Sequence, residues 1–122
     1  MRIEFYEDAK GKKLVNEFLD GLDIKMRQKM LRSVKALQEI GIALRMPLSE
    51  YLEDGIFELR AQVGSNISRV LYFFVVDDKA VLTHGFIKKT QKIPKKEVQK
   101  AKEIREDYLK RQKLAKEGEY NG

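Results

Sequence analysis

The residues Ser68-Arg69-Val70-Leu71-Tyr72-Phe73-Phe74-Val75-Val76 decide the fold of this chain. The apolar run from Val70 to Val76 is far shorter than the roughly 18 residues that indicate a membrane-spanning helix. It is typical of a strand that is buried on both faces of a sheet. Strand-like segments precede and follow it, at residues 56–62 and 81–87, with short turns between them. We therefore expect an antiparallel meander with this strand at its centre.

The N-terminal part of the chain predicts one further strand and a pair of helices. Residues 2–6 alternate between apolar and charged side chains, as a half-buried strand does. Apolar residues recur at helical spacing in residues 12–22 and again in residues 24–40, and Asp23 between them is a favoured N-cap residue. We expect these two helices to form a hairpin that packs on one face of the sheet.

A loop and a C-terminal helix complete the pattern. Residues 42–54 have no clean period and end near the turn pair Asp54-Gly55, which favours a connecting loop. A basic helix is expected to begin after Pro94, and the tail 116–122 is expected to be frayed. The sequence therefore predicts an α+β fold with a small antiparallel sheet, in which a single domain of residues 1–122 has the element order β-α-α-β-β-β-α.

Composition limits the class of protein. A chain of 122 residues with 43% hydrophobic residues can build one compact core but not two domains. It contains no cysteine, which excludes disulfides and thiolate metal sites and suits a reducing cytoplasm. The N-terminus lacks the continuous apolar core of a signal peptide. We therefore expect a cytoplasmic protein that does not bind a membrane.

Positive charge is concentrated in the second half of the chain. The formal net charge is +6, and between His84 and Lys116 there are 12 lysines or arginines against four acidic residues. This excess predicts a salt-sensitive attraction to polyanions, although a solvated helix face is the alternative. Five of the lysines lie between Gly85 and Lys96, where the last strand gives way to the helix, and this arrangement indicates a phosphate-binding region.

Three motifs occur in order along the chain: Gly55-Ile56-Phe57-Glu58-Leu59-Arg60, Arg69-Val70-Leu71-Tyr72 and Gly85-Phe86-Ile87-Lys88-Lys89-Thr90. Over about residues 52–108 they resemble the RelE/HigB family of bacterial toxins, specifically its phage-derived host-inhibition branch. The resemblance implies a RelE-like fold and cleavage of mRNA on the ribosome, with the ribosome and mRNA as partners. It also implies a type II toxin–antitoxin system, in which the cognate antitoxin is a helix-turn-helix protein.

Cleavage of RNA through its own 2′-hydroxyl needs a base, cations for the charge that develops on the phosphate, and an acid for the leaving oxygen. It needs neither a metal nor another cofactor. With one histidine and no cysteine, the chain would depend on arginine, lysine and tyrosine. The resemblance implies that Arg69 contacts the scissile phosphate and that Arg60 is a second catalytic candidate. Ion pairs with Glu58 are the alternative role for both arginines.

The lysines after the last strand are the other catalytic candidates. Lys88, Lys89 and Lys92 match the basic run of the resembled family, and their crowding is one way to lower the pKa of a lysine base. Which of them acts as base or acid stays open. His84 is a further catalytic candidate, with a structural role as the alternative. Tyr108 is expected in the core rather than in proton transfer.

Lysines on the last helix are candidates for binding RNA or the ribosome: Lys95, Lys96, Lys100 and Lys102. The sequence shows no aromatic platform for stacking exposed bases, so the ribosome would have to position the mRNA. Two other functions remain open at this point. One is a toxin of the same fold that inhibits DNA gyrase. The other is a phage nucleic-acid-binding module without catalysis, although no helix-turn-helix pattern supports it.

Overall fold

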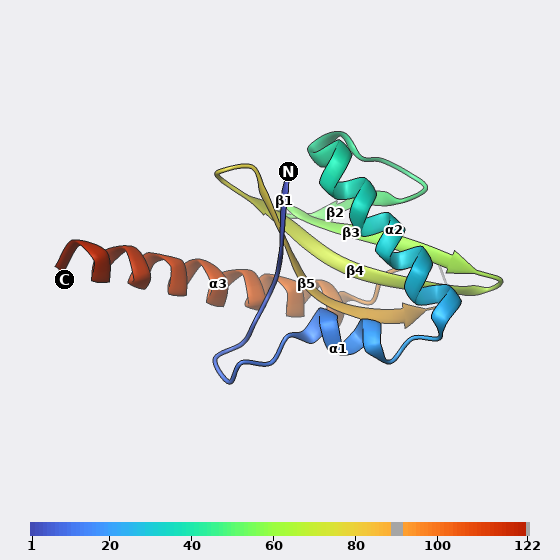
Figure 1. Ribbon diagram of the computed structural model, residues 1–122, viewed down its shortest axis with the longest axis horizontal. Coiled ribbons are helices and arrows are strands. Elements are labelled where there is room, and N and C mark those ends of the chain that lie inside the picture. Colours follow the sequence, from blue (N-terminus) through green and yellow to red (C-terminus); the bar gives the residue numbers. More distant parts are fainter. Residues whose placement is uncertain (89–91, 122) are drawn as a thin grey trace.

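The computed structural model describes residues 1–88 and 92–121, and of residues 119–121 it describes the backbone only. Within these residues five strands and three α-helices form an α+β fold (Figure 1). In chain order the elements are β1 (Arg2–Phe5), α1 (Leu14–Asp20), α2 (Ile24–Ile40), a short 3-10 helix (Gly41–Ala43), β2 (Ser49–Glu53), β3 (Ile56–Val63), β4 (Asn66–Val75), β5 (Lys79–Lys88) and α3 (Lys95–Asn121).

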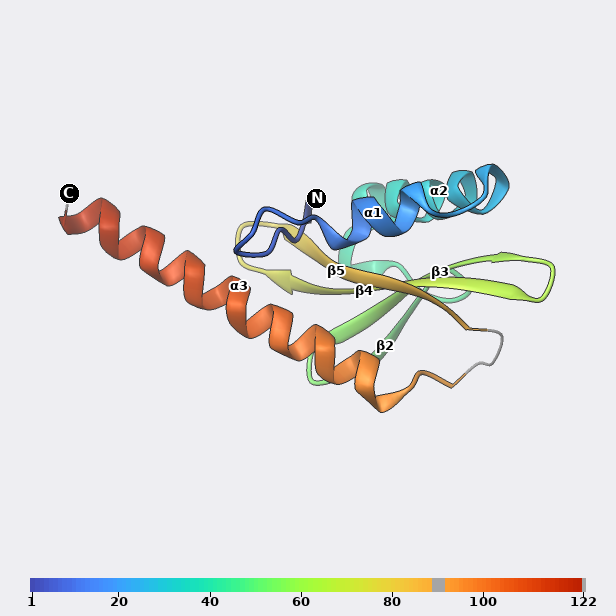
Figure 2. The same ribbon diagram turned by 90° about the horizontal axis from the view of Figure 1, so that it is seen from below.

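The strands form one sheet in the order β1-β5-β4-β3-β2. Its central strand is β4, as the sequence predicts, and β4 pairs antiparallel with both β3 and β5. Figure 2 shows α1 and α2 on one face of the sheet and α3 on the other. Because both faces are covered, every residue from 67 to 73 is buried. The predicted α+β class and the helical hairpin on one face are confirmed.

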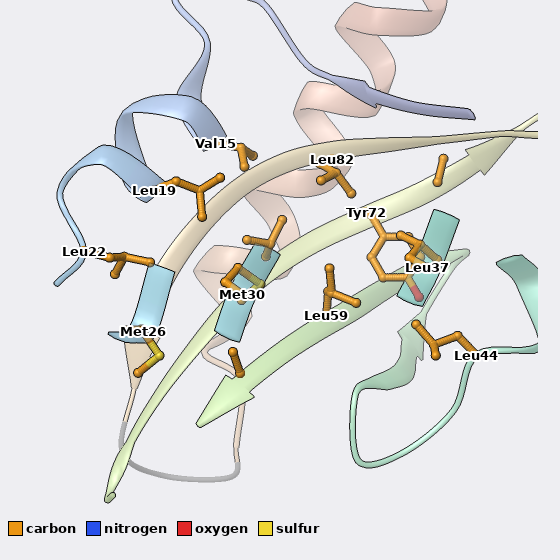
Figure 3. Close-up of a cluster of buried hydrophobic side chains, with 13 residues drawn as sticks. Val15, Leu19, Leu22, Met26, Met30, Leu37, Leu44, Leu59, Tyr72 and Leu82 are labelled. Atoms are coloured by element: carbon orange, nitrogen blue, oxygen red, sulfur yellow. The ribbon is translucent and has the colours of Figure 1, made fainter. Parts of the chain in front are cut away.

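The first core lies between the helical hairpin and the sheet (Figure 3). Met26, Met30 and Leu37 recur at helical spacing on α2 and pack toward Leu59 of β3. Each such buried side chain contributes roughly 1.5–3 kcal/mol relative to its exposed state. The helix begins where predicted, since the Asp23 carboxylate accepts a hydrogen bond from the Met26 N–H at 2.9 Å. These contacts fix α2 along β3.

A second core lies between α3 and the opposite face of the sheet. Ala101, Ile104 and Tyr108 recur at helical spacing and pack in one cluster with Leu71 and Phe73 of β4. The rings of Phe73 and Tyr108 meet edge to face, with centroids 5.7 Å apart. The expected packing role of Tyr108 is confirmed, and α3 is held across the sheet by its first half.

The sheet is mixed, which corrects the expectation of a wholly antiparallel one. β1 pairs parallel with β5, with Arg2 opposite Lys79 and Phe5 opposite Leu82. A parallel pair needs a long connection, and here nearly the whole fold lies between the two strands. The alternation in residues 2–6 reports which face is buried, but it carries no information about the direction of the neighbouring strand.

The segment expected to be a loop, residues 42–54, contains a strand, which is a second correction. β2 pairs antiparallel with the first half of β3, and an irregularity between Tyr51 and Glu53 disturbs its period. The turn residues Asp54 and Gly55 both have positive φ, 47° and 79°. This backbone suits a tight two-residue hairpin turn, for which Asp-Gly is a strong sequence signal. The pair Asp54-Gly55 therefore forms the turn of a β-hairpin between β2 and β3.

The helix α3 continues through residues 116–121 of the C-terminal tail, whose fraying stays a prediction, and residue 122 lies outside the described residues. It extends to Asn121, and Figure 1 shows its second half projecting beyond the sheet. Residues 109–117 are all leucine, lysine, arginine, glutamine, alanine or glutamate, and these good helix formers extend a helix that packing has already nucleated. Within the described parts of the chain, no helix is long and apolar enough to cross a membrane.

Candidate functional site

Three basic residues from neighbouring strands share one face of the sheet. Arg60 on β3 lies opposite Arg69 on β4, and Lys88 at the end of β5 lies opposite Ile67. Residues two apart on a strand point to the same side, and paired residues share a face. The side chains of Arg60, Arg69 and Lys88 therefore face the side that α3 covers. The structure brings together three of the predicted site residues that are far apart in the sequence.

One carboxylate binds both arginines. Glu58 Oε1 lies 2.9 Å from Arg69 Nη1 and 3.4 Å from Arg60 Nε. The side chains of Glu58 and Arg69 are 1% and 0% exposed. The ion pairs with Glu58, which the sequence offered as the alternative role for both arginines, are present. Two guanidinium groups against one carboxylate leave a net positive charge at this point of the sheet, and we refer to Glu58, Arg60 and Arg69 as the arginine cluster.

Burial sets the electrostatics of the arginine cluster. It raises the pKa of the Glu58 carboxyl, while Arg69 and Arg60 act in the opposite direction. Burial also lowers the pKa of Arg69, against the favourable charge of Glu58. Charges removed from water are tolerated when each has a partner at hydrogen-bond distance, as here. Because Arg69 has no exposed surface and Arg60 retains 7%, an anion from solvent reaches Arg60 first.

His84 lies on the same face but is enclosed. Its ring is 3% exposed, stacks on Phe86 and has Nδ1 3.0 Å from the Thr83 hydroxyl. Burial, together with the charge of Lys100, lowers the pKa of His84 to about 4. The ring is therefore neutral at pH 7, so its 3.6 Å approach to Glu97 is not a pair of opposite charges.

The predicted lysines have different surroundings. Lys88 is half-buried, and Lys89 lies outside the described residues. The Lys102 ammonium lies 2.7 Å from Glu53 and 2.8 Å from Asp54, so it binds the turn between β2 and β3. The remaining lysines of this region are exposed: Lys92, Lys95, Lys96 and Lys100. These exposed lysines surround the start of α3 and give this end of the molecule a basic surface.

Two basic residues on α2 were not among the site residues predicted from the sequence. Lys29 and Arg32 line a pocket together with Arg60 at the edge of β3. Their spacing of three residues on one helix was a usable signal. It was obscured because acidic and basic residues balance over the first half of the chain. Among the described residues, no group of three or more His, Asp or Glu side chains could hold a metal ion.

Comparison with known proteins finds one match to a protein family. The family described as phage-derived Gp49-like protein matches residues 17–106. This span begins in α1 and ends in α3, so it includes β2 to β5 and the whole arginine cluster. A search among curated proteins finds no match.

Proposed function

Because the chain belongs to the family of phage-derived Gp49-like proteins, which is associated with the toxins of toxin–antitoxin systems, we propose that it is such a toxin and that it cleaves mRNA on the ribosome. In this proposal it is a type II toxin of the RelE/HigB kind. It acts by attack of the RNA 2′-hydroxyl on the adjacent phosphodiester, which requires no metal. Its action inhibits translation in the cytoplasm.

The arginine cluster is the observation that supports this proposal most. Attack by the 2′-hydroxyl builds negative charge on the phosphate oxygens, and cations that are already oriented stabilise this charge without reorganisation. Arg60 and Arg69 are oriented by the same Glu58 oxygen at 3.4 Å and 2.9 Å. Lys88 adds a third cation on the same face.

The proposed roles follow from exposure. Arg60 reaches solvent and contacts the scissile phosphate, while Arg69 lies behind it and adds to the positive potential. Proton transfer is assigned to Lys88 at the end of β5 and to Lys89 and Lys92, which follow it in the sequence. Of these three, Lys89 lies outside the described residues. His84 is enclosed and neutral, so it supports the packing of α3 rather than proton transfer.

The partners follow from the basic surface. The exposed lysines at the start of α3 would bind the phosphates of ribosomal RNA, an interaction that weakens with salt. The ribosome would hold the mRNA, because a free single-stranded RNA does not keep the geometry that in-line attack requires. A helix-turn-helix antitoxin encoded with the toxin would keep it inactive in the host.

The test is to add the purified protein to a translation extract and to map new mRNA 5′ ends, with the same mRNA lacking ribosomes as control. We expect cuts only in translated mRNA. Arg60→Ala should reduce the rate of cleavage about 100-fold or more, since it removes one charge-stabilising donor. Lys10→Ala, which removes an exposed cation far from the cluster in the sequence, should leave the rate unchanged.

Each outcome distinguishes the proposal from its alternatives. Cuts in free RNA would mean a nuclease that acts without the ribosome. Intact mRNA would favour a toxin of the same fold that acts on DNA gyrase, and an assay of DNA supercoiling would then be decisive. One observation favours that second candidate: Arg69 has no exposed surface, and gyrase inhibition would not need it to meet a phosphate.

A further inference from the structure

A groove runs between α2 and the edge of β3, on the border of the sheet, and we call it the α2–β3 groove. Its volume is about 510 Å³. Nine residues line it: Lys29, Arg32, Ser33, Met46, Pro47, Leu48, Arg60, Ala61 and Gln62. Within the described parts of the chain its lining contains three cations, several apolar groups, and neither an acidic nor an aromatic side chain.

One wall of the groove is an open strand edge. The pairing of β2 with β3 ends where Ser49 lies opposite Leu59. One residue further, the Arg60 N–H donates to the Leu48 carbonyl at 2.8 Å, and the chain then leaves the sheet. Alternate residues of a strand direct their backbone groups to the same side, so the Gln62 N–H points to the groove side, as the Arg60 N–H does. In the described part of the chain, no strand pairs with this end of β3 on that side.

Side chains of α2 hold the outward carbonyls of this edge. The Ser33 hydroxyl donates to the Arg60 carbonyl at 2.7 Å, and the Lys29 ammonium donates to the Gln62 carbonyl at 2.8 Å. A lysine at an exposed edge commonly protects it against unwanted strand pairing. Each carbonyl oxygen has a second lone pair, so these bonds leave the edge able to accept from an added chain.

We propose that the α2–β3 groove binds an extended, acidic segment of a partner protein, which adds to the sheet along Arg60–Val63. Its backbone pairs with the open edge of β3, as in other strand-addition complexes. Its carboxylates approach Lys29, Arg32 and Arg60, and an apolar side chain packs on Met46, which is 55% exposed.

The chemistry of the groove selects this occupant over two others. A nucleic acid would meet the cations, but it would leave the strand edge unpaired and find no aromatic side chain for its bases. A second copy of the chain, paired through the same edge, would place each Arg32 and Lys29 close to its symmetry mate. Like charges at that distance repel, so the groove favours an acidic partner over self-association.

Arg60 connects the groove to the arginine cluster. Its guanidinium lies 3.4 Å from Glu58, and the Nη1 of the same group lies 3.6 Å from the sulfur of Met46, which lines the groove with Arg60. A carboxylate bound there would therefore interact with one of the cations of the candidate site. Binding of the acidic segment to the groove does not depend on the proposed function. Inhibition of RNA cleavage by the segment rests on the proposed function.

The test uses the full chain labelled with nitrogen-15 and a blocked synthetic peptide of alternating glutamate and valine. At low salt we expect the peptide to shift the amide signals of Ala61, Gln62 and Val63. Arg32→Glu should weaken binding about fivefold or more, because it reverses an exposed charge that faces the peptide. Lys110→Glu makes the same charge reversal on the exposed side of α3 and should leave the affinity unchanged.

A second variant separates strand pairing from charge attraction. Gln62→Pro removes the outward N–H without changing the charge, and proline is tolerated on an edge strand when its missing N–H faces away from the ladder. A circular dichroism spectrum like that of the unaltered chain would show that it folds. About tenfold weaker binding would support strand addition. The proposal is overturned if Arg32→Glu and Lys110→Glu bind alike, if only distant amides shift, or if a uridine oligonucleotide shifts these amides and the peptide does not.

Discussion

At the scale of single residues, Glu58 determines how the two arginines can act. Its carboxylate pairs with Arg69 where the side chains of both are almost completely buried, and it also orients Arg60. A buried charge pair contributes little net stability, but the loss of one partner leaves the other charge uncompensated. Glu58 is therefore a positioning residue for the candidate site, and its removal affects more than one side chain.

The arginine cluster predicts a non-additive effect on stability. Arg69→Met should lower the free energy of unfolding by about 3–5 kcal/mol, because it leaves Glu58 with Arg60 alone. The double variant Glu58→Leu with Arg69→Met should lose less than the single variant does. Urea denaturation at pH 7 measures both. For comparison, Lys12→Ala, which removes the exposed pair between Lys12 and Glu17, should change stability by under about 0.5 kcal/mol.

Equal losses in the single and double variants would contradict this account, since they would mean that Arg60 alone compensates the charge of Glu58 when Arg69 is removed.

His84 predicts a dependence of stability on pH. Its pKa of about 4 in the folded chain lies below the 6.5 of an exposed histidine. Between these values the unfolded chain binds the extra proton, so this contribution to stability is present above pH 6.5 and is lost as the pH falls toward 4. From pH 7 to pH 4.5, the unaltered chain should lose roughly 2–3 kcal/mol more than His84→Gln. If the free energies of unfolding of the unaltered chain and of His84→Gln, measured by denaturation, fall in parallel as the pH is lowered, the pKa of His84 is not lowered by folding.

The sequence could predict which residues of the cluster meet, but not how deeply they lie. Glu58 and Arg60 are two apart on a strand and so share a face, and the Arg69 strand was expected beside them. The complete burial of Arg69 depends on what covers the sheet. No local pattern around Arg69 contains that information, because the covering comes from other parts of the chain.

At the scale of elements, the docking of α1 on β5 depends on a missing side chain. A Cβ atom at Gly85 would lie 2.2 Å from Cδ2 of the Phe18 ring. The ring therefore rests directly on the backbone of β5. Any side chain at this position would push α1 outward and would also disturb the strand that ends in Lys88.

Gly85→Ala tests this contact. We expect a loss of about 1–3 kcal/mol in the free energy of unfolding, which is the usual cost of overpacking a core. In a Phe18→Ala background the same change should cost under about 1 kcal/mol, because the ring is no longer in the way and alanine suits a strand better than glycine does. Thermal and urea denaturation measure the coupling. A similar cost in both backgrounds would place the strain elsewhere.

Among the elements, the helices, the central strands and the edge strand β1 were predictable, whereas the edge strand β2 was not. The apolar stripe of α2 and the apolar run of β4 indicate which residues are buried, and the spacing of apolar residues in a sequence shows this directly. β2 is short, irregular near Tyr51 and largely exposed, so its apolar and polar residues do not alternate clearly. The backbone of β2 belongs to the sheet because Asp54-Gly55 folds it back on β3, and that signal lies in the turn rather than in the strand.

At the scale of the whole molecule, two basic regions meet at the edge of β3. The arginine cluster lies on the face that α3 covers, and the α2–β3 groove lies beside the helix on the opposite face. Arg60 belongs to both regions. The sequence predicted the basic surface of the C-terminal half, but the groove is assembled from α2, a turn and a strand edge. Such an assembly becomes visible only when the strand order is known.

The parallel pairing of β1 with β5 also has a consequence for the order in which the chain is made. Arg2 leaves the ribosome well before its partner Lys79, because α1, α2 and β2 to β4 lie between them in the sequence. Until then the N-terminal strand has no neighbour to pair with, and contacts between such distant residues form slowly. A newly synthesised chain therefore completes its sheet late, and α3 and the lysines around its start emerge later still. The β1 edge of the sheet is therefore completed only after β5 has been synthesised.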